Sequence, residues 1–210
     1  NEVAVDYNAG FTGAAAGLYN YFGTPDMKPQ ENFPPKEEPK QSFFIEGLIN
    51  QENKERKQFT VRVTSAQTQP PAYLNGFKAR YYFNISELLE NGQSIDDVSV
   101  EIYYDQIESD TKGAFKSNVE GPFKVDDETY YIEMDWTGII FHGSRELQLG
   151  IIVGQDKEYN SNWDPTNDYS REGLVKSDDF QDTVNIPLYY KGDLVYGEPF
   201  GDDPEPPKTP

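Results

Sequence analysis

The segment from Trp163 to Ser170 concentrates side chains that can bind a cation. Asp164, Asn167 and Asp168 offer carboxylate and amide oxygens within five residues. Calcium is a hard cation that takes about six to eight oxygen ligands, mostly carboxylates and carbonyls on irregular backbone. The spacing therefore agrees with a calcium site, and also with an Asx-rich turn whose side chains bond their own backbone.

Aromatic side chains are a second chemical resource of this chain, which has 15 Tyr, 13 Phe and 2 Trp. Their rings supply apolar area for a core, and flat faces on which sugar rings can stack. We expect most of them in the core. For any single tyrosine, an ordinary core or surface position remains as good an interpretation as a sugar contact.

The charge balance narrows the classes of partner. With 18 Lys and Arg against 37 Asp and Glu, the net charge is −19. This field repels nucleic-acid phosphates and anionic membrane surfaces, so we expect neither as a partner. A neutral polysaccharide or a calcium ion is compatible with it. The chain has no Cys and a single histidine, His142, so neither a zinc site nor a catalytic triad is expected. His142 precedes Gly143 in an apparent turn and is expected to be a loop residue.

Three segments differ in composition. Residues 9–22 are rich in Ala and Gly with apolar residues at helical spacing, which predicts a short helix ending at Gly23. Residues 23–42 carry five prolines among charges, which is typical of a semi-stiff linker. Residues 201–210 are acidic and proline-rich and are interpreted as a second linker.

Residues 43–200 show the period-two alternation of half-buried strands. Phe59, Val61 and Val63 alternate with polar residues, and the same pattern recurs around 98–104, 130–136 and 147–153. Residues 186–196 predict a hairpin with its turn at Lys191-Gly192-Asp193, and Ser86 is expected to cap one helical turn. Many short strands separated by turns predict an all-β fold, an antiparallel β-sandwich of the jelly-roll kind.

The first residues, Asn1 to Phe11, resemble the end of the catalytic domain of family nine glycoside hydrolases. The matching pattern is Glu2, Ala4, Asn8 and Ala9. The resemblance implies that Glu2 is the general acid of a parent enzyme. Inverting hydrolysis also needs a second carboxylate about 6.5–9.5 Å away, which the family supplies from an Asp far upstream. Asp6 is too close in sequence to replace it, so residues 1–22 are interpreted as the remnant of a catalytic domain, and Glu2 in this chain alone as a solvated carboxylate.

Most of residues 43–200 resemble family three carbohydrate-binding modules. The matching motifs are Trp163–Ser170, Arg80–Leu88, Asn118–Phe123 and Leu194–Pro199. The resemblance implies a calcium ion as cofactor, held by Asp164, Asn167 and Asp168 together with Asn84 and Ser86. Members often carry Asp or Thr at the last two positions, so this half of the site is less charged here, and Glu87 is a further candidate ligand.

The family resemblance also indicates a sugar-binding strip, which is depleted in this chain. Its Asp is retained as Asp105, Gln106 replaces its His, and its Trp falls near Asn160, beside Tyr159. The candidate substrate-binding residues are Tyr103, Asp105, Gln106, Glu108 and Tyr159. This pattern resembles the type c subgroup, which is fused to the catalytic domain, binds crystalline cellulose poorly and steers a single chain into the active site.

The resemblance implies a secreted cellulose-binding module of an endoglucanase, free or attached to a cellulosome. Its partners would be cellulose or a single β-1,4-glucan chain and the family nine catalytic domain. Three alternatives stay open: an autonomous anchor on crystalline cellulose, a glucan-hydrolysing chain, and a structural spacer. The absent upstream base argues against hydrolysis by this chain alone, and the depleted strip argues against an autonomous anchor.

Overall fold

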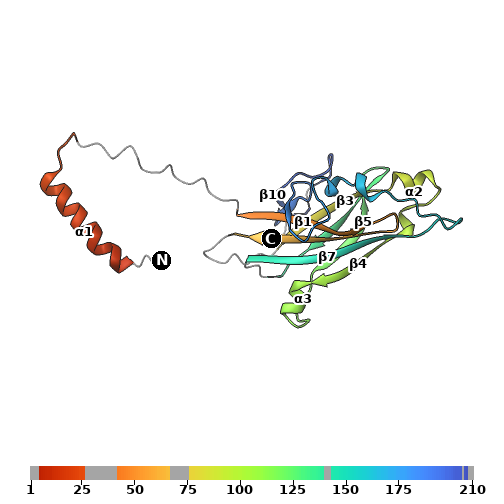
Figure 1. The fold of residues 1–210 in the computed structure, drawn as a ribbon, viewed down its shortest axis with the longest axis horizontal. Coiled ribbons are helices and arrows are strands. Elements are labelled where there is room, and N and C mark those ends of the chain that lie inside the picture. Colours follow the sequence, from red (N-terminus) through yellow and green to blue (C-terminus); the bar gives the residue numbers. More distant parts are fainter. Residues whose placement is uncertain (1–4, 27–41, 67–75, 140–142, 205, 208–210) are drawn as a thin grey trace. The chain divides into compact units, whose positions relative to one another are not determined.

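The structure, a computed structural model, describes residues 5–26, 42–66, 76–139, 143–204 and 206–207 (Figure 1). These residues belong to two compact units, Asn1–Pro39 and Lys40–Pro210. Glu2, His142 and most of the expected linker 23–42 lie outside the described residues. No helix within the described ranges is long and apolar enough to cross a membrane.

The first unit contains one helix, α1, at Val5–Phe22. It begins four residues earlier than the helical spacing of apolar residues predicts, and its end before Gly23 is as expected. The amide of Gly23 donates a hydrogen bond to the Tyr19 carbonyl at 2.7 Å. Five large apolar side chains of α1 are exposed, namely Phe11, Leu18, Tyr19, Tyr21 and Phe22. A helix of this length depends on packing against another surface for its stability.

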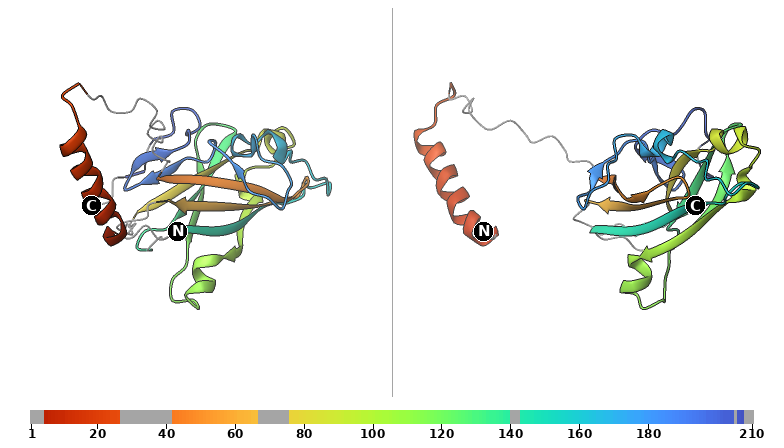
Figure 2. Two further views of the ribbon diagram at one scale, coloured as in Figure 1. Left: turned by 60° about the vertical axis from the view of Figure 1, so that its left-hand side comes forward. Right: turned by 45° about the vertical axis from the view of Figure 1, so that its right-hand side comes forward.

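The second unit is a sandwich of two antiparallel five-stranded sheets, which confirms the predicted fold class (Figures 1 and 2). Sheet A has the order β4-β7-β2-β1-β8, with bounds Val98–Asp105, Gly143–Val153, Arg56–Ser65, Phe43–Glu52 and Gln181–Asp182. Sheet B has the order β10-β9-β3-β6-β5, with bounds Asp193–Tyr196, Leu188–Tyr190, Phe77–Asn84, Thr129–Asp135 and Asn118–Lys124.

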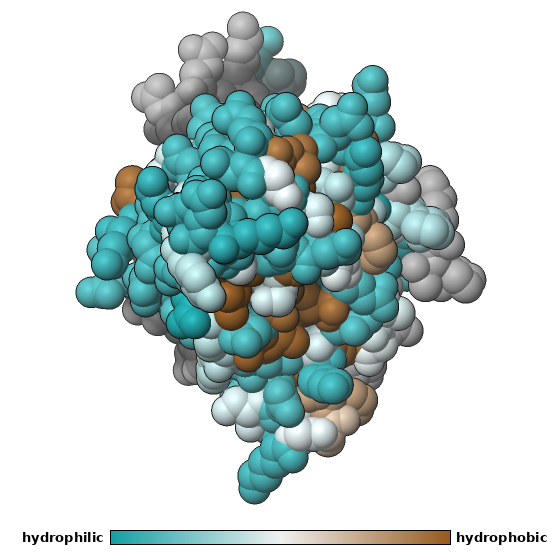
Figure 3. All heavy atoms as spheres, turned by 90° about the vertical axis from the view of Figure 1, so that its right-hand side faces the viewer, coloured by the Kyte–Doolittle hydropathy of each residue, from teal (hydrophilic) through white to brown (hydrophobic). Residues whose placement is uncertain are grey.

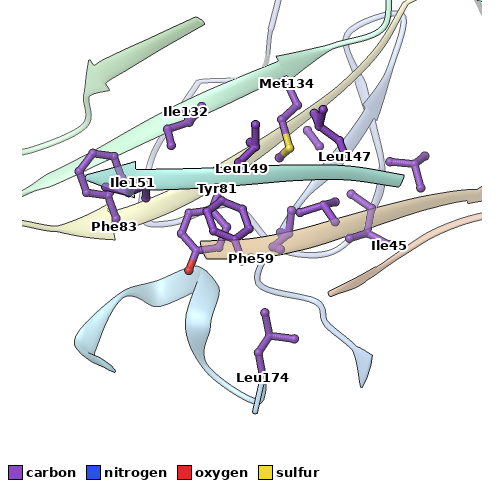
Figure 4. Close-up of a cluster of buried hydrophobic side chains, with 14 of the residues drawn as sticks. Ile45, Phe59, Tyr81, Phe83, Ile132, Met134, Leu147, Leu149, Ile151 and Leu174 are labelled. Atoms are coloured by element: carbon purple, nitrogen blue, oxygen red, sulfur yellow. The ribbon is translucent and has the colours of Figure 1, made fainter. Parts of the chain in front are cut away.

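The core lies between the two sheets and follows from the alternation in the strands. Phe59, Val61 and Val63 of β2 are fully buried, whereas Arg62 between them reaches the outer face. Phe59 from sheet A stacks on Tyr81 from sheet B with ring centroids 4.0 Å apart (Figure 4). Burial of such rings is the main apolar contribution to the stability of the sandwich.

The predicted hairpin is present as β9 and β10. Its turn residues Lys191 and Gly192 both have positive φ, 53° and 90°. This is the backbone of a type I′ turn, whose twist matches that of the strands it joins. The Lys-Gly pair therefore positions the end of sheet B as the sequence indicated.

Short helical turns connect the strands at the ends of the sandwich. They are α2 at Ser86–Glu90, η1 at Ile95–Asp97, α3 at Gln106–Asp110, η2 at Pro165–Asn167 and η3 at Tyr169–Arg171. The prediction that Ser86 caps α2 is wrong: the N-cap is Ile85, and no side chain caps this helix. The Ser86 hydroxyl instead donates to Oδ1 of Asn84 at 2.6 Å, and the backbone N–H of Ser86 donates to the same oxygen at 2.7 Å.

Candidate functional site

Asp168, the central residue of the expected cation site, is a buried loop residue that bonds to one strand of each sheet. It lies between η2 and η3 and is 2% exposed. Its Oδ1 accepts the backbone N–H of Asn84 at 2.9 Å. Its Oδ2 accepts a hydrogen bond from Nζ of Lys57, at 2.8 Å. Burial raises the pKa of Asp168 to about 6, because the ion loses water, while the nearby Lys57 ammonium opposes that rise.

Lys57 comes from β2 and is fully buried. Besides Asp168, its Nζ donates to the carbonyl of Pro165 at 2.7 Å, and it lies 5.4 Å from the centroid of the Tyr81 ring. A carboxylate, a carbonyl and an aromatic face thus surround one ammonium group. These are the groups that stabilise a positive charge away from water.

The four other expected calcium ligands have partners of their own. Oδ1 of Asn84 accepts from the Ser86 N–H and hydroxyl. Oδ1 of Asp164 accepts from the Thr166 N–H at 3.0 Å and from its hydroxyl at 2.7 Å. The amide Nδ2 of Asn167 donates to Oε1 of Glu87 at 2.6 Å. Asp164 and Asn167 are exposed, so their side chains lie at the surface and not beside the buried Asp168.

The side chains as arranged do not fit a calcium ion between Asp168 and Pro165. An ammonium group stands beside the carboxylate oxygen, and one carboxylate is short of the ligand number that calcium takes. Within the described residues, no group of three or more His, Cys, Asp or Glu side chains converges on a point where a metal could bind. Oε2 of Glu87 is buried with no hydrogen-bond partner among these residues, so the acceptor capacity of this oxygen is unused there.

Lys57 was not among the residues expected at the site, although the sequence holds a signal for it. In β2, Lys57 has the same strand phase as Phe59, Val61 and Val63, all of which face the core. A charged residue on the buried face of a strand needs a counter-charge inside the protein, since burying an unpaired ion is very unfavourable. That requirement points to an internal carboxylate, which the structure identifies as Asp168.

The outer face of sheet A is mainly polar, with Tyr103 as an exposed aromatic. Tyr103 is 38% exposed and lies over Gly150 of the adjacent strand β7. The guanidinium of Arg56 is 5.8 Å from the centroid of its ring. In the neighbouring row, Nε2 of Gln148 donates to Thr60, whose hydroxyl donates to Asn50 at 2.9 Å. Planar amides beside an aromatic ring form a surface suited to sugar hydroxyls and C–H faces.

Three of the expected sugar contacts lie at the end of β4 and differ in exposure. Asp105 is 6% exposed, and its two oxygens accept the backbone N–H groups of Ile107 at 2.9 Å and Ser117 at 2.6 Å. Its carboxylate therefore caps the N-terminus of α3, and both of its oxygens are engaged in hydrogen bonds to the backbone. Gln106 accepts the N–H of Glu146 at 3.0 Å, and Glu108 is exposed on α3.

Tyr159 lies away from these residues, on the loop that follows β7. It is 83% exposed with φ of 65°, and Asp156 ties the loop together by accepting the N–H groups of Glu158 and Asn160. The loop leaves β7 at Val153, which pairs with Val98 at the start of β4, whereas Asp105 ends β4. A strand of this length spans roughly 25 Å. The structure thus places four of the five expected contacts at two ends of sheet A, namely Asp105, Gln106 and Glu108 at one end and Tyr159 at the other, with Tyr103 between them.

The outer face of sheet B carries a network of charged side chains whose contacts are not evident from the sequence. Arg80 donates through Nε to Glu133 at 3.1 Å, and through Nη1 to Asp203 at 2.7 Å. Tyr82 donates to the same Asp203 oxygen at 2.7 Å. Part of the segment interpreted as a second linker therefore lies on sheet B, and Pro206 within it is buried. Hydrogen bonds between buried ions fix that segment in place.

An apolar edge remains open between the two sheets, at β4 and β5. Val98, Val100, Ile102, Val119 and Pro122 line a pocket of about 240 Å³ there, and Ile102 is 45% exposed. The face of the molecule in Figure 3 is mostly hydrophilic, with hydrophobic side chains gathered in one area. Edge strands with exposed apolar residues are surfaces on which another domain can pack.

The chain belongs to the cellulose binding domain family, whose model matches residues 44–197. The fold and the family together define a carbohydrate-binding module. Endoglucanase A of Bacillus pumilus is 34% identical over 203 residues, which are 94% of this chain and 29% of that protein. Endoglucanase 4 of a Bacillus species is 32% identical over 94% of this chain and 29% of its own length.

Solved structures agree with this assignment. The endoglucanase CelQ of Clostridium thermocellum, in complex with cellotriose, is 30% identical with a TM-score of 0.72, over 94% of this chain and 32% of that one. The module CBM3b from cellobiohydrolase 9A of the same organism is 21% identical, with a TM-score of 0.51 over 75% of this chain and 97% of its own, and shares the fold. The chain spans about a third of the length of the endoglucanases that it matches.

Proposed function

We propose that this module binds a β-1,4-glucan chain and assists an endoglucanase catalytic domain of glycoside hydrolase family nine that precedes it in the same protein. The matches to endoglucanases carry this proposal. They cover 94% of the chain, which is more than residues 43–210 alone could supply, so they extend into the N-terminal helical segment. The same order of helical segment and module therefore recurs in proteins named as endoglucanases.

The surface of α1 supports a neighbouring catalytic domain. Its exposed apolar residues, Phe11 and Leu18 among them, find no cover within the described part of their own unit. Burial of one such side chain stabilises a protein by about 1.5–3 kcal/mol. In the proposed protein, α1 is the last helix of the catalytic domain and packs against it, and Glu2 just before it is the general acid.

The outer face of sheet A is the proposed glucan surface. Tyr103 supplies a ring for stacking, and Gln148 and Asn50 supply planar amides beside it. Exposed Tyr159 and Glu108 extend the surface at its two ends, with Gln106 beside Glu108. The strand β4 carries two neighbouring exposed rings, Tyr103 and Tyr104. So short a run of rings suits a single glucan chain better than the flat face of a crystal, which needs several coplanar rings.

Because cellulose is insoluble and lies outside cells, the proposed role requires an extracellular protein. The net charge of −19 is compatible with a neutral glucan as partner. Export of the full protein from its native host, measured as glucanase activity and antigen in the culture medium, tests this location. Retention of the antigen within intact cells would contradict it.

The glucan contact is tested with cellohexaose and the purified chain by NMR titration. We expect chemical-shift changes at Tyr103 and its neighbours on sheet A, and about a tenfold loss of affinity in Tyr103→Ala, equal to ~1.4 kcal/mol. Phe115→Ala is the matched control, because Phe115 is a 57% exposed aromatic on the loop after α3. Shift changes confined to sheet B would contradict the assignment.

Microcrystalline cellulose distinguishes assistance from anchoring. A module that feeds one glucan chain leaves most of the purified protein in the supernatant, whereas an autonomous anchor is retained on the solid. A sugar-release assay on soluble cellulose tests hydrolysis by the chain itself, where we expect no product. Mixing the chain with a separately expressed family nine catalytic domain tests assistance directly: more soluble sugar per insoluble reducing end supports it, and an unchanged ratio refutes it.

A further inference from the structure

The ammonium group of Lys57 connects two sheets and a loop, which is a role that a structural divalent cation can fill. Three parts of the fold meet at its ammonium group: Lys57 belongs to β2 of sheet A, Asp168 to the η2–η3 loop, and Asn84, whose N–H also bonds Asp168, to β3 of sheet B. Among the described residues Lys57 makes the direct ion pair with Asp168, and Arg171 is a more distant positive charge that also interacts with this carboxylate.

The surroundings of Lys57 are those of a permanent structural ion. Both side chains of the pair are 0% exposed, and Nζ of Lys57 is satisfied by two oxygens, at 2.8 Å and 2.7 Å. The Tyr81 ring covers a further side of the ammonium group, at 5.4 Å. Burial disfavours the charged form of Lys57, and the Asp168 carboxylate opposes that effect. Removing one partner of such a pair leaves an uncompensated buried charge, which is strongly destabilising.

We propose that the Lys57 ammonium is the internal cation that ties sheet A to sheet B through Asp168, so that the module folds and holds its loops without a divalent metal ion. The loop that begins at Trp163 is then hydrogen-bonded to both sheets. Nε1 of Trp163 donates to the Asn84 carbonyl at 2.9 Å, and the Pro165 carbonyl accepts from Lys57. The Lys57 ammonium is covalently part of the chain and cannot dissociate from it. The stability of the module is therefore independent of the calcium concentration in the medium.

This proposal competes with calcium binding, and Glu87 is the residue that a metal would use. Its Oε2 is buried without a hydrogen-bond partner among the described residues, and its Oε1 already accepts from Asn167. One free oxygen beside an ammonium-paired Asp168 falls short of the ligands that calcium requires. A bound calcium ion would also lie near the Lys57 ammonium and be repelled by it.

The first experiment uses the unmodified chain. Its melting temperature is measured by scanning calorimetry in EDTA and in millimolar calcium chloride at matched ionic strength. We expect the two melting temperatures to agree within replicate error, and isothermal titration with calcium chloride to give no binding isotherm. A higher melting temperature in calcium, or stoichiometric calcium binding, would overturn the proposal whatever the variants show.

The second experiment removes the ammonium group. Lys57→Met keeps the length of the stem and leaves Asp168 buried without a counter-ion, so we expect the melting temperature to fall by about 10 °C, in EDTA and in calcium alike. The matched control Lys116→Met changes an exposed lysine and should melt like the parent. A parent-like melting temperature for Lys57→Met would refute the role of Lys57.

A double variant separates loss of the pair from general damage. In Lys57→Met with Asp168→Asn, neither buried charge remains, and an apolar or neutral replacement of a buried pair is often close to neutral in stability. We therefore expect the double variant to melt several degrees above Lys57→Met. Additive losses from the two substitutions would show that the two groups do not act as a pair.

Discussion

The ring of Tyr103 lies directly over Gly150 of the neighbouring strand, where any side chain would displace it. A Cβ built on Gly150 would stand well within 3.0 Å of the ring. The substitution Gly150→Ala should therefore tilt Tyr103 off the outer face of sheet A. We expect the affinity for cellohexaose to fall at least fivefold, or ~1 kcal/mol, as measured by calorimetric titration.

Gly154→Ala is the control for that change. A Cβ at Gly154 meets only Asp97, at 3.4 Å, which is an ordinary contact. Its affinity should remain that of the parent chain. Equal losses of affinity in both variants would mean that Tyr103 has no special place on the glucan surface.

The contact of Arg80 with Asp203 predicts that the C-terminal segment stabilises sheet B. Both side chains are nearly buried, and the Asp203 carboxylate holds the pKa of Arg80 above its ordinary value. Asp203→Asn removes the charge but keeps the shape, and Arg80 retains its bond to Glu133. We expect the free energy of unfolding in urea to fall by about 2 kcal/mol. Asp202→Asn, at an exposed neighbouring position, should lose no more than about 0.5 kcal/mol; equal losses would show that the contact is not a stabilising one.

Asp105 should matter for stability through the backbone that it caps. In Asp105→Ala, α3 loses its N-cap and the buried N–H of Ser117 loses its acceptor. We expect a loss of about 3 kcal/mol in urea unfolding. Asp110→Ala, at the exposed end of the same helix, is the comparison and should stay close to the parent. If Asp105→Ala unfolded like Asp110→Ala and bound cellohexaose more weakly, Asp105 would be a sugar contact and not a cap.

The loop that carries Tyr159 should loosen in acid. Hydrogen bonds from the Asn160 backbone and the Asn162 side chain lower the pKa of Asp156 to about 2, from 3.8. Because the folded pKa is depressed, the carboxylate stabilises the loop above pH 3.8, and that contribution is lost as the pH falls from 3.8 toward 2. NMR titration should show the Asn160 amide moving with a midpoint near the lower value. Asp156→Asn should abolish the transition; its persistence in the variant would assign it to another group.

Separate units predict independent folding. Residues 1–39 and 40–210 form two compact parts, and both sheets and the buried core consist of residues of the second part. A chain that begins at Lys40 should therefore keep the melting temperature of the full chain to within about 2 °C, by calorimetry. A larger fall would show that the N-terminal segment packs on the sandwich and not on another domain.

Local signals in the sequence were sufficient to predict the sandwich and its family. The alternation of Phe59, Val61 and Val63, and the Lys191–Gly192 turn, are local signals whose meaning does not depend on distant residues, because strand phase and turn backbone are set within a few positions. The same locality explains why α1 was predicted with only its first turn missing.

The pairing of side chains across the fold could not be predicted in this way. Lys57 and Asp168 are 111 residues apart, and Arg80 and Asp203 are 123 apart, so no spacing rule could pair them. The cage expected from Asp164, Asn167 and Asp168 assumed that neighbours in sequence point to one centre, yet two of them face solvent and one faces the core. Successive side chains of a 3-10 turn point in different directions. Which of them meets a charged partner depends on the strands that pack against the turn.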